Sequence, residues 1–172
     1  MIPEKLIDRV QNAVDGDELI KLTADLVRIN SVWDPVAGTS EQVVAEYVMR
    51  WAENQGFEVQ MDEVAPGRSN VIVTYPAGPG EGALMFEGHT DVVTPGDVSV
   101  WTYDPFGAEI VDGCMYGRGT NDTKGNLAAM LIAMAALKRT GITLAGSIIG
   151  GALCDEEDQM LGVQDFIDRG HA

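Results

Sequence analysis

Two short apolar runs, GALMFEGH (residues 82–89) and AGSIIGGALC (residues 145–154), most constrain how this chain can fold. Each is short, β-rich or apolar, and bounded by turn residues, which is typical of a strand inside a sheet. Each also ends in polar side chains that can bind a cation. His89 closes the first run with Asp91 two positions beyond it, and the acidic stretch DEED follows the second. The pattern predicts a sheet whose strand ends carry chemistry.

The rest of the chain alternates between helical and strand patterns. Asp17 is predicted to cap the second helix, and Thr39 with Gln42 the third. The predicted helices span 4–14, 17–29, a segment that ends near 54, 124–138 and 160–169; further strands span 57–64 and 70–77, and a hairpin within 108–119 turns at Asp112-Gly113. Because helices and strands are interleaved, the predicted fold class is α/β, with helices packed on a mixed sheet.

The charge of the chain excludes several kinds of partner. Eleven Lys and Arg residues face 27 Asp and Glu residues, a net charge of -16. Such a surface repels phosphate backbones and anionic lipids, so we expect no nucleic acid and no membrane partner. No apolar run approaches the roughly 20 residues that span a bilayer, and no basic segment leads into an apolar N-terminus. We expect a cytoplasmic protein in which Cys114 and Cys154 are packed free thiols.

The polar residues at the predicted strand ends have plain explanations when taken singly. His89 and Asp91 can form a simple hydrogen-bonded pair, DEED can be a solvated loop, and Asp122 can cap the helix that begins near residue 124. Their combination suggests more, because residues two apart on a strand share a face. A carboxylate such as Asp91 is a usual partner for a metal-bound histidine.

The adjacent glutamates Glu156 and Glu157 can divide two roles between them. One can coordinate a metal while the other takes a proton from water. Nitrogen and oxygen donors without thiolate suit Zn²⁺, with Co²⁺ or Mn²⁺ as other occupants.

Three blocks of the sequence, in order, resemble one zinc-dependent family. They are GHTDVV, WTYDPFGAEIVDGCMYGRGTNDTKGNLAAM and CDEED. The family includes acetylornithine deacetylase, succinyl-diaminopimelate desuccinylase, aminoacylase and glutamate carboxypeptidase, and the resemblance covers most of residues 20–170. It implies a zinc aminopeptidase-like, three-layer αβα domain with a mixed, mostly parallel sheet. It also implies hydrolysis of an amide bond in N-acyl amino acids or small peptides.

The resemblance further implies a site with two Zn²⁺ ions, for which Co²⁺ or Mn²⁺ can substitute. His89 matches a ligand of one ion, Glu157 a ligand of the other, and Asp122 the carboxylate that bridges them. Glu156 matches the general base, and Asp91 the residue that orients His89. The peptide bond between Asp122 and Thr123 is expected to be cis.

In the resembling family each metal is completed by ligands that come later in a longer chain. Residues 1–172 are therefore expected to be the N-terminal portion of the catalytic domain, without the lid and dimerisation domain and the C-terminal part. His171 is not assigned a ligand role. We expect weak or absent metal binding, no significant hydrolysis by this chain alone, and self-association through an uncovered sheet edge. The alternative is a non-catalytic binding or interaction module that retains the fold.

Overall fold

The computed structural model describes residues 3–76, 80 and 82–171. The last residue of the predicted strand 70–77 lies outside this described part. The elements, in chain order, are α1 (Glu4–Gln11), α2 (Gly16–Arg28), α3 (Gln42–Asn54), β1 (Glu58–Ala65), β2 (Arg68–Tyr75), β3 (Ala83–His89), the 3-10 helix η1 (Val98–Val100), β4 (Glu109–Val111), β5 (Cys114–Tyr116), α4 (Lys124–Thr140), β6 (Ser147–Leu153) and α5 (Leu161–Asp168). Every helix and strand predicted above is present.

The main sheet has the strand order β1-β2-β6-β3, and β4 with β5 forms a separate hairpin. β3 runs parallel to β6, whereas β1 with β2 and β2 with β6 are antiparallel. The predicted mixed sheet is confirmed, but within the described residues it is not mostly parallel. For β1 and β2 the reason is local, because only residues 66–67 separate them and such a short connection forces an antiparallel pair, whereas β2 and β6 are far apart in the chain.

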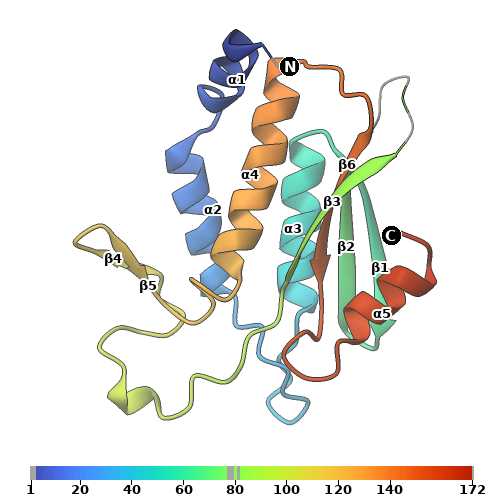
Figure 1. Cartoon of the computed structure of the whole chain (residues 1–172). Helices are drawn as coiled ribbons and strands as arrows, with labels where there is room; N and C mark the ends of the chain where they lie inside the picture. Colours follow the sequence, from blue (N-terminus) through green and yellow to red (C-terminus); the bar gives the residue numbers. More distant parts are fainter. Residues whose placement is uncertain (1–2, 77–79, 81, 172) are drawn as a thin grey trace.

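Helices cover both faces of this sheet, which confirms the three layers (Figure 1). Successive residues of β2 point to opposite faces, as the pleat requires. Val71 belongs to the large core formed with α2, α3 and α4, and the next residue, Ile72, packs with Leu153 and Phe166 of α5. Among the described residues, α5 supplies the helical cover of that second face.

Two predicted helix caps are wrong by a small shift. Asp15, not Asp17, caps α2, because the Asp15 carboxylate accepts the N–H of Glu18 at 3.0 Å. At α3, the N-cap residue is Glu41, whose side chain caps no N–H of the helix, and the Ser40 hydroxyl accepts the N–H of Gln42 at 3.3 Å. The backbone of Thr39 pairs instead with Asp34, which closes the preceding loop and removes Thr39 from the helix end. In both places neighbouring polar residues offered several capping candidates.

β3 forms one edge of the main sheet. Leu84 and Phe86 lie on one face of this strand and are 56% and 49% exposed. An edge strand presents unpaired backbone groups that a second chain can pair with. The expected self-association through this edge stays a prediction.

In the described part of the chain no helix is both long and apolar enough to cross a membrane.

His171 lies against β1, which forms the opposite edge of the main sheet from β3, the strand that ends in His89. Its Nε2 donates to Asp62 Oδ2 at 3.0 Å, and Gln60 Nε2 donates to Asp62 Oδ1 at 3.0 Å. Burial raises the pKa of Asp62, but the hydrogen bonds from Gln60 and His171 and the charge of Arg169 lower it overall. These contacts stabilise the ionised form of the Asp62 carboxylate, and the His171 side chain is one of its hydrogen-bond donors.

We expect Asp62→Asn to reduce the free energy of unfolding by about 1 to 3 kcal/mol at pH 7, because charge-assisted hydrogen bonds are lost. Since the pKa of Asp62 is lowered by folding, its contribution is complete above the unfolded value of about 3.9 and disappears as pH falls through the folded value. Urea unfolding at a series of pH values should therefore show the variant and wild type converging in acid. Exposed Asp168→Asn is the control, and a difference that is independent of pH would contradict this account.

Candidate metal centre

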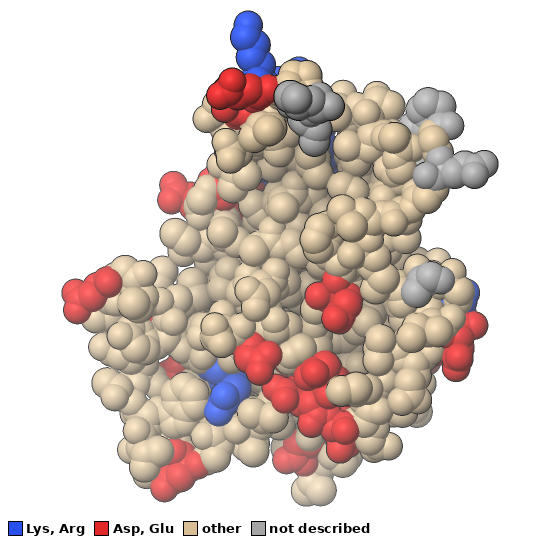
Figure 2. All heavy atoms as spheres, viewed as in Figure 1, with Lys and Arg blue, Asp and Glu red and all other residues tan. Residues whose placement is uncertain are grey.

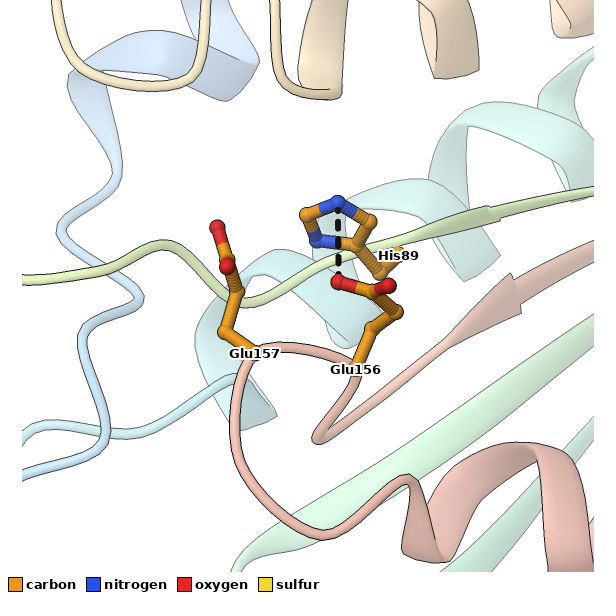
Figure 3. A group of neighbouring side chains, drawn as sticks. All are labelled: His89, Glu156 and Glu157. Atoms are coloured by element: carbon orange, nitrogen blue, oxygen red, sulfur yellow. Dashed lines mark ion pairs between the residues drawn. The ribbon is translucent and has the colours of Figure 1, made fainter.

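The C-terminal ends of β3 and β6 meet at one edge of the main sheet. The two strands are parallel neighbours, and His89, the last residue of β3, is in register with Leu153, the last residue of β6. The loop that follows β6 therefore passes directly beside His89, and it carries Glu156 and Glu157 (Figure 3). The carboxyl ends of neighbouring parallel strands are where ligand sites form in α/β folds.

His89 is buried and has a different partner on each ring nitrogen. Nδ1 donates to the backbone carbonyl of Asp91 at 3.0 Å, and Nε2 lies 3.1 Å from Asp122 Oδ1 and 3.6 Å from Glu156 Oε2. Burial lowers the pKa of His89, but hydrogen bonds with Asp91 and Asp122 raise it to about 9. A cation that binds Nε2 must therefore displace a proton.

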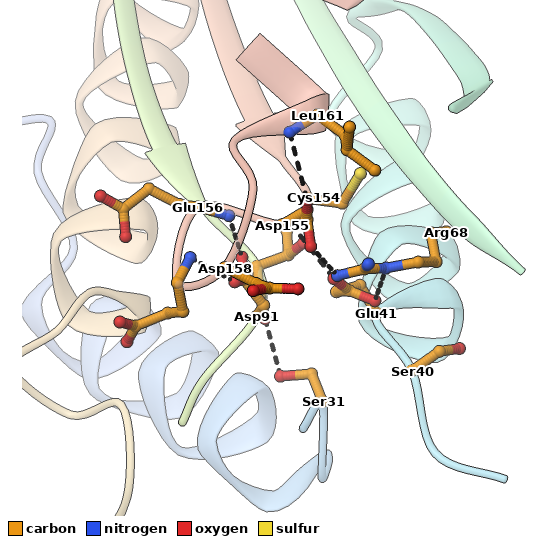
Figure 4. Close-up of polar contacts among 12 residues, drawn as sticks. Ser31, Ser40, Glu41, Arg68, Asp91, Cys154, Asp155, Glu156, Asp158 and Leu161 are labelled. Atoms are coloured by element: carbon orange, nitrogen blue, oxygen red, sulfur yellow. Dashed lines mark hydrogen bonds and ion pairs between the residues drawn. The ribbon is translucent and has the colours of Figure 1, made fainter. Parts of the chain in front are cut away.

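Asp91 holds the glutamate loop more directly than it holds His89. Its carboxylate accepts the backbone N–H of Glu156 at 3.1 Å and that of Glu157 at 2.8 Å, and Figure 4 shows the contact with Glu156. Its nearer oxygen is 3.6 Å from His89 Nδ1, so the closer contact with the imidazole is made by its backbone carbonyl. Burial raises the pKa of Asp91, but hydrogen bonds from His89, Glu157 and Glu156 lower it overall.

Three of the predicted site residues converge. His89, Glu156 and Glu157 each offer one ligand atom, and among the described residues these atoms lie within 4.8 Å of one another. Asp122, whose side chain is 72% exposed, contacts His89 Nε2 but is not a member of this group.

Asp122 does not cap α4. The N-cap residue is Thr123, and no side chain caps this end in the described structure. The peptide bond between Asp122 and Thr123 is cis, as predicted.

The charges around His89 fit a divalent cation. The carboxylates of Asp91, Asp122, Glu156 and Glu157 surround a single imidazole, and the ion pairs that the described residues make with this set all come from His89. Burial raises the pKa of Glu157, and the neighbouring carboxylates add to that rise while His89 opposes it. Figure 2 shows Asp and Glu side chains gathered in the lower middle of the view, where β3 and β6 end in Figure 1. Uncompensated oxygen donors beside a neutralisable imidazole are the ligands of Zn²⁺ and similar ions.

A cavity of about 330 Å³ opens beside Glu157 and combines apolar walls with charged groups. It is lined by Val32, Trp33, Arg68, Asp91, Val92, Val93, Thr94, Glu157 and Asp158. The cavity therefore adjoins the ligand cluster, since Glu157 belongs to both.

Sequence reasoning missed the buried charges behind this edge. Lys124 is fully buried, and its Nζ donates to the carbonyl of Ile29 at 2.7 Å. Burial lowers the pKa of Lys124 to about 7, against the opposing charge of Asp91. Arg68 is 3% exposed and pairs with Glu41 and Asp155. Arg68 follows the turn-rich stretch APG, which predicts an exposed side chain, so no local signal marked it.

A three-layer α/β domain with histidine and carboxylate donors beyond the ends of two parallel strands is an arrangement that suits the binding of a divalent cation. The chain belongs to peptidase family M20/M25/M40, whose family model matches residues 85–172. This confirms the family resemblance described above.

Curated relatives support the same family. A probable succinyl-diaminopimelate desuccinylase of Staphylococcus epidermidis is 36% identical over 152 residues, which cover 88% of this chain and 36% of that protein. An acetylornithine deacetylase of Pasteurella multocida is 37% identical over 140 residues, covering 80% of this chain and 35% of that protein. The chain thus spans about a third of the length of these relatives.

The fold also matches solved structures. Human carnosine dipeptidase 1 superposes with a TM-score of 0.79 at 22% sequence identity, over 97% of this chain and 38% of that one. The same arrangement of layers therefore persists at low sequence identity.

Proposed function

We propose that this chain supplies one side of the active site of a metal-dependent amidohydrolase. The observation that carries the proposal is the convergence of His89, Glu156 and Glu157 at the joint end of β3 and β6. Membership of a peptidase family supports the proposal. The names of the two curated relatives, a desuccinylase and a deacetylase, support it as well. The substrate class proposed is an N-acyl amino acid or a small peptide, which suits the size of the adjacent cavity.

His89, Asp122 and Glu157 are the residues proposed to hold the metal, with Asp122 shared between two ions. The Nδ1–H of His89 is engaged by a carbonyl, which leaves Nε2 as the donor to the metal. Zn²⁺ is the proposed ion, with Co²⁺ or Mn²⁺ as substitutes, because the donors are nitrogen and oxygen. A divalent cation held there supplies Lewis acidity, which lowers the pKa of a nearby water and polarises an amide carbonyl.

Glu156 is proposed to be the general base. Its carboxylate is exposed and lies 3.6 Å from His89 Nε2, so it reaches the same space without a fixed hydrogen-bond partner among the described side chains. It takes a proton from the attacking water and returns it to the leaving nitrogen. Asp91 is not proposed as a second general base, because its carboxylate oxygens already accept two backbone N–H groups. Asp91 instead orients the loop and, through its carbonyl, His89.

The proposed site needs ligands beyond those that the described residues bring together. Catalytic zinc is normally held by three protein ligands and one water. With Asp122 shared, each ion would receive two ligands from this chain. We therefore propose that residues 1–172 act as the N-terminal portion of a larger catalytic unit that includes a lid and dimerisation domain. On their own they are expected to bind metal weakly and to be inactive.

The cytoplasm is the proposed location, supported by the thiols. Cys154 is free and buried, as predicted, but the prediction of a packed thiol is wrong for Cys114, which is exposed because it lies in the separate β4–β5 hairpin. A free, exposed thiol suits a reducing compartment. Burial raises the pKa of Cys154 to about 12, which makes it an inert core thiol.

The test compares this chain with a completed fusion, in which the chain is joined to the part of the Pasteurella multocida relative beyond the aligned region. Elemental analysis after dialysis against Zn²⁺ should find little metal on the chain and two ions on the fusion. The fusion, and not the chain, should hydrolyse N-acetyl or N-succinyl amino acids. Tight stoichiometric zinc and turnover by the chain alone would contradict the proposed incompleteness. A folded fusion with neither metal nor turnover would favour the non-catalytic module.

A further inference from the structure

A buried ionic cluster lies directly behind the glutamate loop (Figure 4). It consists of Glu41, Arg68 and Asp155, all almost fully buried. Arg68 Nε lies 3.1 and 3.0 Å from the two carboxylate oxygens of Glu41, and Arg68 Nη2 also contacts Glu41. Arg68 Nη2 makes an ion pair with Asp155 Oδ1 at 2.6 Å, and this oxygen accepts no hydrogen bond of good geometry from the described residues, so its contact with Arg68 is one of charge. These residues stand at the start of α3, the start of β2 and the end of β6, so the cluster joins three elements.

Asp155 also organises the loop that carries Glu156 and Glu157. Its own N–H donates to Glu41 Oε1 at 3.2 Å. Its Oδ2 accepts the N–H groups of Gln159 at 3.3 Å and Leu161 at 3.2 Å, which closes the far end of the loop. Asp155 has a positive φ of 64°, a backbone conformation that a non-glycine residue adopts only where its surroundings hold it.

Packing alone does not account for this cluster. Burying three charged groups is costly, and apolar side chains of similar volume often stabilise a fold as well or better. A planar guanidinium, however, can bind two carboxylates in fixed geometry, which apolar groups cannot do. The guanidinium of Arg68 also lies 4.4 Å above the ring of Trp33, and both residues line the cavity beside Glu157.

We propose that Arg68 is a positioning residue that fixes the Glu156–Glu157 loop by clamping Asp155 against Glu41. It contacts none of the three candidate ligand residues and forms only part of the wall of the adjacent cavity. Its effect reaches them through Asp155 at the start of the loop, while Asp91 holds the next two backbone N–H groups. The consequence for cation affinity rests on the proposed metal centre, whereas the consequence for the loop does not.

The test is amide hydrogen exchange in the metal-free chain, followed by titration of the completed fusion with Co²⁺. We expect Arg68→Met to speed exchange at the amides of Glu156 and Glu157 by about 10-fold or more beyond any change in global unfolding. Co²⁺ affinity should fall about 10- to 100-fold, the usual effect of losing a group that orients metal ligands. Arg68→Lys keeps the positive charge but lacks the planar guanidinium. It should therefore give a smaller increase in the exchange rate and a smaller decrease in Co²⁺ affinity.

Arg139→Met is the matched control. Arg139 of α4 also connects separate elements, since it pairs with the carboxylate of Glu18 in α2 and donates to the amide oxygen of Gln55 after α3. These contacts join helices and do not involve the loop of Glu156 and Glu157. Loop exchange and Co²⁺ affinity should stay at wild-type values in this variant. If Arg68→Met does not fold, Arg68→Lys decides the question.

Wild-type exchange at Glu156 and Glu157 in the folded Arg68 variants would overturn the proposal, and so would an equal increase in Arg139→Met. Absence of Co²⁺ binding by the wild-type fusion would instead count against the metal centre. The exchange measurement would then still decide whether Arg68 positions the loop.

Discussion

In the completed fusion, Glu156→Gln is expected to lower kcat by about 10²- to 10⁴-fold, the usual contribution of a general base, while the bound metal stays unchanged. Glutamine keeps the size and hydrogen-bonding capacity of the side chain but cannot accept the proton from water. The backbone N–H of residue 156 would still donate to Asp91, so the loop should keep its position. Steady-state kinetics with an N-acyl amino acid, together with elemental analysis of the same sample, measures both parts.

Two further variants serve as comparisons for Glu156→Gln. Asp168 of α5 is exposed and does not line the cavity, so Asp168→Asn removes one negative charge with little expected effect on kcat. Glu157→Gln should lose metal, because Glu157 is the proposed ligand. A Glu156→Gln fusion with activity within a few-fold of wild type would remove Glu156 from the role of base. Loss of metal in that variant would make Glu156 a ligand instead.

His89→Ala is expected to weaken Zn²⁺ or Co²⁺ binding by at least about 100-fold, more than the loss of an orienting partner. His89 is the nitrogen donor of the cluster in the described chain, and its removal leaves carboxylates facing one another. Isothermal titration of the completed fusion measures the affinity. Circular dichroism checks that the fold is retained.

His171→Ala is the matched control for His89→Ala. His171 binds Asp62 near β1 and contributes no atom to the cluster, so its removal should reduce stability without changing metal affinity. Equal losses of affinity in the two variants would show that the effect is not specific to the site. Unchanged affinity in His89→Ala would exclude His89 as a ligand.

Local patterns predicted the elements well and their pairing less well. Apolar periodicity located the helices and strands because each pattern depends on neighbours within one or two turns. Strand order and direction depend on contacts between distant segments. The expectation of a mostly parallel sheet thus failed where β2 pairs with both β1 and β6 in antiparallel fashion. Caps were misplaced by one or two residues where polar side chains stand side by side, as at Asp15 and Asp17.

The sequence by itself determined which chemical groups stand at the strand ends, namely a histidine after one apolar run and paired glutamates after another. Residue type and spacing are enough for that, since a short polar stretch after a buried strand emerges at the sheet edge. Only the tertiary structure decided that these groups meet, because the register of His89 with Leu153 comes from pairing two strands far apart in the chain.

The tertiary structure alone also decided what stands behind the site. Arg68, Glu41 and Asp155 are ordinary surface residue types, and each lies in a different part of the sequence. They become a buried cluster because α3, β2 and β6 pack around one point, and in the described part of the chain the ion pairs of these three residues are made with one another.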